Sequence, residues 1–167
     1  LDAQILGGGQ ERGRRAGTPD VAGAAAFAAA ATATVAARDT DVVRLGALRD
    51  RLVVGLRGRL GEVVAPTVLD GGAPVAAGIA HVVLADVEAE ALLFLLDAAG
   101  VRASAASSCS SGAQDPSHVL AAMGVDRMVA QGSLRLSLGH TTTEADIEAA
   151  LECIPPAVER LRAHGGG

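Results

Sequence analysis

Residues 133–161 read SLRLSLGHTTTEADIEAALECIPPAVERL, and this stretch decides the fold class. Leucines alternate with polar residues in its first part, which is the period of a strand with one buried face. The second part opens with Thr143-Glu144-Ala145-Asp146, a capping-box pattern that predicts a helix start. One helical stripe then carries Ile147, Leu151, Ile154, Val158 and Leu161. A half-buried strand followed by an amphipathic helix indicates an α+β domain.

The segments between residues 61 and 132 repeat this alternation of short strands and helices. Strands are predicted at 63–67, 79–85 and 101–104, and a turn at 70–74. Helices are predicted at 87–99, with Asp86 as its cap, and at 117–123. This order predicts a mostly antiparallel sheet with helices over one face. In the last helix, Pro155-Pro156 predicts a kink.

The first 60 residues have a different character. A glycine-rich basic loop at 7–17 precedes Thr18-Pro19-Asp20, where Thr18 is the expected N-cap of an alanine-rich helix. Asp39-Thr40-Asp41 interrupts or caps that helix. Leucines at helical spacing then predict a second helix, or a continuation of the first: Leu45, Leu48, Leu52, Leu56 and Leu60. The expected organisation is 1–38 as a remnant of a larger domain, 39–60 as a connecting helix and 61–167 as a small α+β domain.

Composition narrows the class of protein. The net charge is −5 without charge runs, which argues against nucleic-acid or membrane partners, and no transmembrane stretch or signal peptide is expected. All 14 basic residues are arginine, and the chain begins at Leu1 within a strand-like sequence. Both features fit a fragment whose N-terminal part is absent. The two cysteines, Cys109 and Cys153, are expected to be reduced thiols in a cytoplasmic protein.

Cys109 is the first candidate for chemistry. It lies in residues 104–118, SAASSCSSGAQDPSH, where the neighbours have the composition of an exposed loop rather than of a packing shell. An accessible thiol is a nucleophile when its pKa is lowered. The alternative, a small surface thiol, is the commoner case for an arbitrary cysteine.

Two further residues are candidates for binding anions. Arg135 should point away from Leu134 and Leu136, and its guanidinium has the geometry to hold a carboxylate through two hydrogen bonds. Thr18 stands at a helix N-terminus after glycines and arginines, which is a pattern for phosphate binding. The ordinary alternatives are a surface arginine and a simple N-cap.

The histidines point to no metal site, since their spacing from the cysteines does not match that of metal ligands. His81 is expected to be a structural histidine within its strand. Cys153 is expected to pack beside the stripe of the last helix. A thiol hydrolase using Cys109 with His118, oriented by Asp115, is a further hypothesis.

At these residues the chain resembles the pyridoxal-phosphate-dependent cysteine desulfurases of the NifS/IscS type. The resemblance covers nearly the whole chain through three ordered motifs. They are GGGQERGRRAGT at 7–18, SSCSSG at 107–112 followed by PSHVLAAMG at 116–124, and SLRLSLG at 133–139 followed by TTE at 142–144. The length of the cysteine segment resembles the IscS/NifS branch.

This resemblance implies roles for three residues. Cys109 would attack the sulfur of L-cysteine, giving alanine and a persulfide for an acceptor protein, and in some relatives it is a transient iron–sulfur ligand on a scaffold protein. Arg135 would hold the substrate carboxylate. Thr18 would bind the pyridoxal 5'-phosphate of the neighbouring subunit in a homodimer. The implied fold is the small C-terminal domain of a fold-type I enzyme, with a remnant of the large domain and a long connecting helix.

The chain departs from the family pattern in one respect that matters for activity. The family's cofactor-binding lysine would lie upstream of Leu1, and this sequence contains no lysine. The chain is therefore expected to be inactive alone, as part of a desulfurase. Ala106 also stands where the family motif has glycine. The alternative reading is a non-catalytic scaffold that docks sulfur acceptors.

Overall fold

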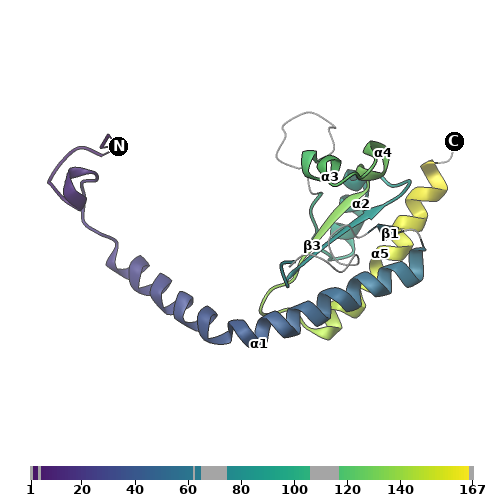
Figure 1. Cartoon of the computed structure of the whole chain (residues 1–167), viewed down its shortest axis with the longest axis horizontal. Helices are drawn as coiled ribbons and strands as arrows, with labels where there is room; N and C mark the ends of the chain where they lie inside the picture. The colour runs from purple at the N-terminus through teal and green to yellow at the C-terminus, as the bar shows by residue number, and fades with distance from the viewer. Residues whose placement is uncertain (1, 4, 62, 65–74, 106–116, 166–167) are drawn as a thin grey trace. The chain divides into compact units, whose positions relative to one another are not determined.

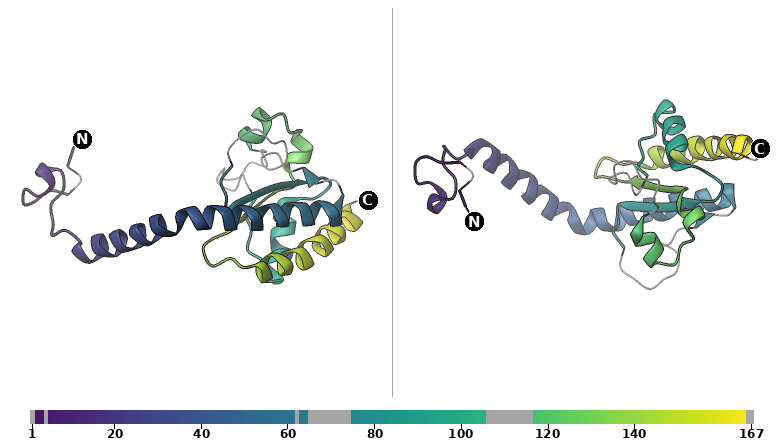
Figure 2. Two further views of the ribbon diagram at one scale, coloured as in Figure 1. Left: turned by 60° about the horizontal axis from the view of Figure 1, so that its bottom comes forward. Right: turned by 90° about the horizontal axis from the view of Figure 1, so that it is seen from above.

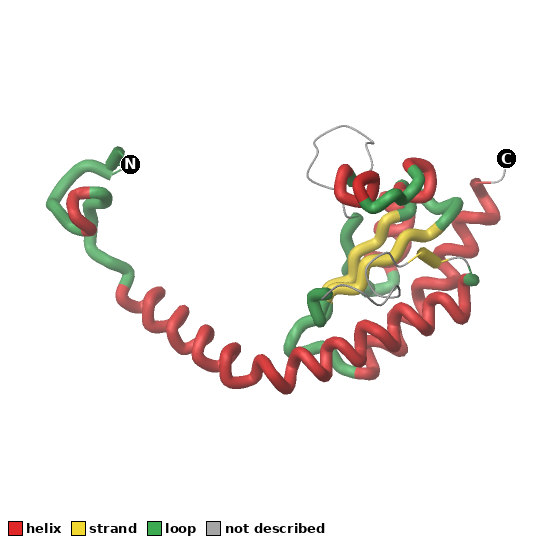
Figure 3. Tube along the Cα trace, in the orientation of Figure 1, coloured by secondary structure: helices red, strands yellow, loops and turns green. Residues whose placement is uncertain are grey.

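The computed structural model describes residues 2–3, 5–61, 63–64, 75–105 and 117–165. Its internal contacts divide the chain into two compact units, Leu1–Asp39 and Thr40–Gly167. Figure 3 shows that both helices and strands contribute to the described part of the second unit. The predicted turn at 70–74 and the segment 106–116 that contains Cys109 lie outside the described residues.

A three-stranded antiparallel sheet organises the second unit (Figure 1). The order is β1-β2-β3, with β1 at Val63–Val64, β2 at Ile79–Leu84 and β3 at Ser133–Ser137. Strands were predicted in both the β2 and the β3 segments, and the structure confirms them. Residues 101–104 form no strand, and Ser104 makes only an isolated bridge to Arg135.

One face of this sheet carries the main core. The side chains of Ala80, Val82, Leu84, Leu134 and Leu136 on that face are buried. Three helices complete the core: the C-terminal part of α1 (Val21–Leu60), α2 (Ala89–Ala98) and α5 (Glu144–Gly165) (Figure 2). The predicted stripe of α5 is confirmed, since Ile147, Leu151, Ile154 and Val158 are buried and Leu161 packs against them. Removing these aliphatic side chains from water is the main favourable term in folding this unit.

The opposite face of the sheet is covered in part, which corrects the expectation of helices over one face only. Short helices α3 (His118–Ala122) and α4 (Arg127–Ala130) place Leu120 and Ala130 against Val83. α4 was not among the helices predicted from the sequence. Its signal was Asp126, whose carboxylate caps the helix by accepting from Met128 N at 2.8 Å.

Helix α1 is a single helix of 40 residues. It begins at Val21, and Asp20 caps it by accepting from Gly23 N at 2.8 Å, so the expectation of Thr18 as N-cap is wrong. The reason is a turn in which Val21 N donates to Pro19 O and leaves Asp20 at capping distance. Asp39-Thr40-Asp41 does not end the helix, because Asp41 forms an ion pair with Arg44 one turn later, at 3.0 Å.

By length and composition alone, α1 is long and apolar enough to cross a membrane, with an 18-residue window of mean hydropathy 1.4. Alanine supplies most of this apolarity, so the window was not singled out in the sequence, and the expectation of no transmembrane stretch stays untested. Exposed Phe27 and Val35 lie in the same half of the helix. The other half packs in the core of the second unit.

Helix α2 begins later than predicted. Asp86 has a φ of +57°, a left-handed conformation that continues a turn and delays the helix to Ala89. At the other end, Gly100 has a φ of +82° and closes the helix, as its glycine predicts.

Helix α5 starts at the predicted capping box and continues through both prolines. Asp146 N donates to Thr143 Oγ1 at 3.3 Å, and Thr143 N donates to Asp146 Oδ2 at 2.8 Å. Pro155-Pro156 does not interrupt the helix. Pro155 cannot donate to the carbonyl of Leu151, but the Arg59 guanidinium of α1 donates to that carbonyl instead. A tertiary contact thus replaces the hydrogen bond that proline removes.

Candidate functional site

A row of polar side chains crosses the outer face of the sheet, opposite the main core. His81 of β2 and Ser104 both pair directly with Arg135 of β3, one on each side. Directly opposed residues in antiparallel strands point to the same face. Ser133 shares that face, since it lies two residues before Arg135 on the same strand. The structure therefore groups His81, Ser133 and Ser104 around the predicted carboxylate-binding arginine.

Arg135 is exposed, whereas its neighbours Leu134 and Leu136 are buried, as the alternation predicted. Its backbone is held on the Ser104 side by two hydrogen bonds, from Ser104 N to Arg135 O at 3.0 Å and from Arg135 N to Ser104 O at 2.7 Å. No described residue forms an ion pair or side-chain hydrogen bond with its guanidinium. As far as the described residues are concerned, all N–H donors of the guanidinium are available to a ligand.

His81 is half-buried, and its Nε2 lies 2.7 Å from Ser133 Oγ. This bond agrees with the expectation of a structural histidine. Burial lowers the pKa of His81, and the nearby Arg135 cation lowers that pKa further. The imidazole is therefore neutral at neutral pH. No functional role for His81 could be predicted from the sequence, because its pairing with Arg135 depends on strand register.

Stability should depend on pH through His81. In the unfolded chain His81 takes up a proton near pH 6.5, whereas the folded form resists protonation until a lower pH. The unfolded state thus binds more protons in the window below 6.5, and the free energy of unfolding should fall as the pH falls through it. Urea titrations between pH 7.5 and 5.5 measure this slope. In His81→Asn the slope should be shallower; an unchanged slope would contradict the assignment to His81.

Cys109 lies outside the described residues, so the structure does not place its thiol. Chain length nevertheless limits its distance from the row. Cys109 follows Ser104 by five residues. At about 3.6 Å per residue, its Cα is within roughly 18 Å of the Ser104 Cα. Its covalent tether therefore starts beside Arg135.

Thr18 belongs to the other unit, after a glycine-rich segment that closes on itself. Ala16 N donates to Ile5 O at 3.2 Å, and a Cβ on Gly7 would come within 2.8 Å of the Ala16 Cβ. The structure describes Thr18 as exposed, and its hydroxyl has no hydrogen bond to another described residue. Thr18 and Arg135 thus belong to different units of the chain.

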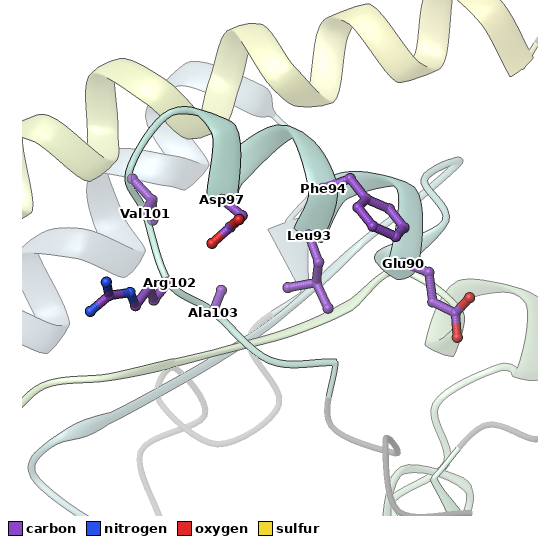
Figure 4. Close-up of a pocket in the computed structure, with 7 residues that line it drawn as sticks. All are labelled: Glu90, Leu93, Phe94, Asp97, Val101, Arg102 and Ala103. Carbon is purple, nitrogen blue, oxygen red and sulfur yellow. The ribbon is translucent and has the colours of Figure 1, made fainter. Parts of the chain in front are cut away.

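A hollow of about 560 Å³ is lined by α2 and by residues 101–103 (Figure 4). Phe94, a residue that is 79 % exposed, projects at one end, and Asp97 and Arg102 lie toward the other. Neither His81 nor Arg135 lines it. The described residues of its lining include no cysteine and none of the three residues predicted to carry the chemistry.

The other candidates that the structure describes, His118 and Cys153, form no hydrogen bond or ion pair with the residues of the row. His118 is exposed at the start of α3, and Cys153 of α5 is a half-buried free thiol. Within the described ranges, no three acidic, histidine or cysteine residues come together in a way that could hold a metal ion.

Comparison with known proteins defines the class of this chain. The aminotransferase class-V family model matches residues 7–150, and the chain belongs to that family. Within it, the chain is homologous to cysteine desulfurases. It is 51 % identical to the IscS-like cysteine desulfurase of Mycobacterium tuberculosis over 157 residues, which are 93 % of this chain and 39 % of that protein.

Two further comparisons agree. The chain is 40 % identical to the cysteine desulfurase IscS of Methanosarcina thermophila, over 97 % of this chain and 39 % of that protein. A solved NifS-like protein superposes with a TM-score of 0.77 at 31 % identity, covering 96 % of this chain and 40 % of that one. The chain therefore spans about two fifths of the length of these relatives.

The family uses pyridoxal phosphate, and the residues present do not by themselves form a site for it. Thr18 offers one free hydroxyl donor for a phosphate oxygen. The Asp20 carboxylate already accepts a hydrogen bond from Gly23 N in the first helical turn. It also places a negative charge at this helix N-terminus. The sequence also has no lysine to bind the cofactor covalently.

Proposed function

We propose that this chain is the C-terminal part of a cysteine desulfurase in which Arg135 binds the substrate carboxylate and Cys109 receives the sulfur. One observation carries the proposal: the backbone of Arg135 pairs with Ser104, five residues before Cys109. The residue proposed to bind the carboxylate is thus hydrogen-bonded, through its backbone, to the residue from which the chain continues to Cys109. The homology to cysteine desulfurases supports the same reading.

Arg135 is suited to an amino-acid carboxylate. Its guanidinium is always charged and presents two parallel N–H donors that match the two carboxylate oxygens. No described acidic residue competes for it. The rigid strand beneath fixes the Cα from which this side chain extends.

The proposed step moves one sulfur atom. The Cys109 thiolate attacks the sulfur of L-cysteine and forms a new S–S bond, while the bond between that sulfur and the substrate Cβ breaks. The electron pair of the broken bond stays with the substrate, and Cβ takes up a proton to give L-alanine. The persulfide on Cys109 is then available to a sulfur-acceptor or iron–sulfur scaffold protein.

The remaining assignments follow from the family. We assign residues 1–38 to a remnant of the large domain, 39–60 to the connecting helix and 61–167 to the small domain of a fold-type I enzyme. Thr18 would contact the cofactor phosphate of a partner subunit in a homodimer. Covalent attachment of the cofactor requires a lysine from elsewhere in the parent protein.

The experiment compares variants of the full-length protein that contains this chain. Cys109→Ala should reduce alanine formation from L-cysteine by at least about 100-fold, because the sulfur loses its acceptor nucleophile. Cys153→Ala is the matched control and should retain activity within about twofold, since that thiol lies on α5 away from the polar row. Equal activity in Cys109→Ala and the parent would overturn the proposal.

A further inference from the structure

Given the proposed function, we propose that His81, anchored by Ser133, is a positioning residue that holds the Arg135 guanidinium ready for the substrate carboxylate. The three side chains share the outer face of the β2–β3 ladder. His81 stands directly opposite Arg135, at a separation that brings the Cβ atoms of such a pair to about 5 Å. Its imidazole is therefore a lateral neighbour of the arginine side chain.

Arg135 needs such a neighbour. A long arginine side chain on an exposed strand position samples many rotamers, and ordering it on ligand binding reduces affinity. No described residue restrains the guanidinium through an ion pair or a hydrogen bond. Packing against a fixed ring removes part of this freedom before the ligand arrives.

His81 has the properties of a fixed surface. Its Nε2 is tied to Ser133 Oγ at 2.7 Å, which sets the orientation of the ring. A planar imidazole offers the kind of face on which a guanidinium stacks. Because the ring is neutral at neutral pH, it does not repel the cation.

The two sides of Arg135 differ. Ser104, on the side away from His81, is small, and its hydroxyl donates to Ala105 O at 3.1 Å. Arg135 thus has a ring on one flank and a short, already bonded side chain on the other. This asymmetry directs a carboxylate toward the Ser104 side, where the segment leading to Cys109 begins.

The charged surroundings of His81 are simple in the part of the chain that is described. β3 contributes Arg135, and α3 and α4 pack on this face through Leu120 and Ala130 at Val83. No described carboxylate shifts the pKa of His81. The influence of His81 on substrate binding is therefore exerted through Arg135.

The first test measures steady-state desulfuration in the full-length protein. His81→Leu should raise KM for L-cysteine about tenfold, equivalent to about 1.4 kcal/mol, with kcat within about twofold. His81→Asn, which keeps a planar polar group beside Ser133, should restore KM to within about threefold of the parent. Ser137→Ala, on the same face but opposite Ile79, is the control and should leave KM unchanged. An unchanged KM in His81→Leu would overturn the proposal.

The second test does not depend on activity. ¹⁵N relaxation of the Arg135 Nε–Hε group in the 167-residue chain reports the order of the guanidinium. The parent and His81→Asn should show an ordered group, and His81→Leu a mobile one; equal order in all three would overturn the positioning role. If the full-length parent forms no alanine from cysteine, the proposed function fails, and the relaxation result still decides whether His81 positions Arg135.

Discussion

Gly132→Ala is expected to lower the free energy of unfolding by about 3 kcal/mol or more. Gly132 precedes β3 and passes directly over the end of β2, where Leu84 N donates to its carbonyl at 3.0 Å. A Cβ there would overlap the Leu84 carbonyl oxygen, and it would lie 2.9 Å from the carbonyl carbon and 3.0 Å from Val87 O. All three obstacles are backbone atoms, so no side-chain rotation relieves them.

Gly139→Ala is the matched control, because Gly139 follows the same strand and has no atom within 4 Å of a built Cβ. Its free energy of unfolding should stay within about 0.5 kcal/mol of the parent. Urea denaturation followed by circular dichroism measures both variants. Equal stability of Gly132→Ala and Gly139→Ala would mean that the close approach of β2 to residue 132 is wrong.

Arg59→Met should lower the free energy of unfolding by about 2 kcal/mol, a loss of stability second only to that of Gly132→Ala. The variant keeps most of the aliphatic stem but removes the donor that reaches the Leu151 carbonyl. Pro155 cannot supply a replacement, so a partly buried carbonyl loses its partner. Denaturant unfolding of the single variant measures this loss.

A double-mutant cycle tests the physical reason. In Pro155→Ala, the new N–H of residue 155 can bond to the Leu151 carbonyl, so Arg59→Met should then cost about 1 kcal/mol less. Pro156→Ala creates an N–H that can bond to the carbonyl of Glu152, an exposed residue. Because Arg59 does not donate to that carbonyl, this variant should show no coupling to Arg59. Zero coupling between Arg59 and Pro155 would show that the arginine does not compensate for the proline.

Much of the fold could be predicted because its signals are local. The alternation at Leu134 and Leu136, the stripe of α5 and the Thr143 capping box each depend on residues within a few positions of one another. Failures occurred where one local signal competed with another. At the start of α1, Asp20 displaced Thr18 as the cap, and at Asp86 a left-handed turn delayed α2. The short helix α4 had only Asp126 as its signal.

In the candidate site, too, local sequence determined one feature and tertiary structure decided the others. Period-two alternation by itself determined that Arg135 points away from the core, because successive side chains of a strand alternate between faces. Only the tertiary structure decided that His81 and Ser104 flank it, since their registers join segments 54 and 31 residues apart in sequence, as 135 − 81 and 135 − 104. The strands adopt the register that buries their apolar face against α1, α2 and α5 together. Because these elements are distant in sequence, no short window of sequence can predict that register.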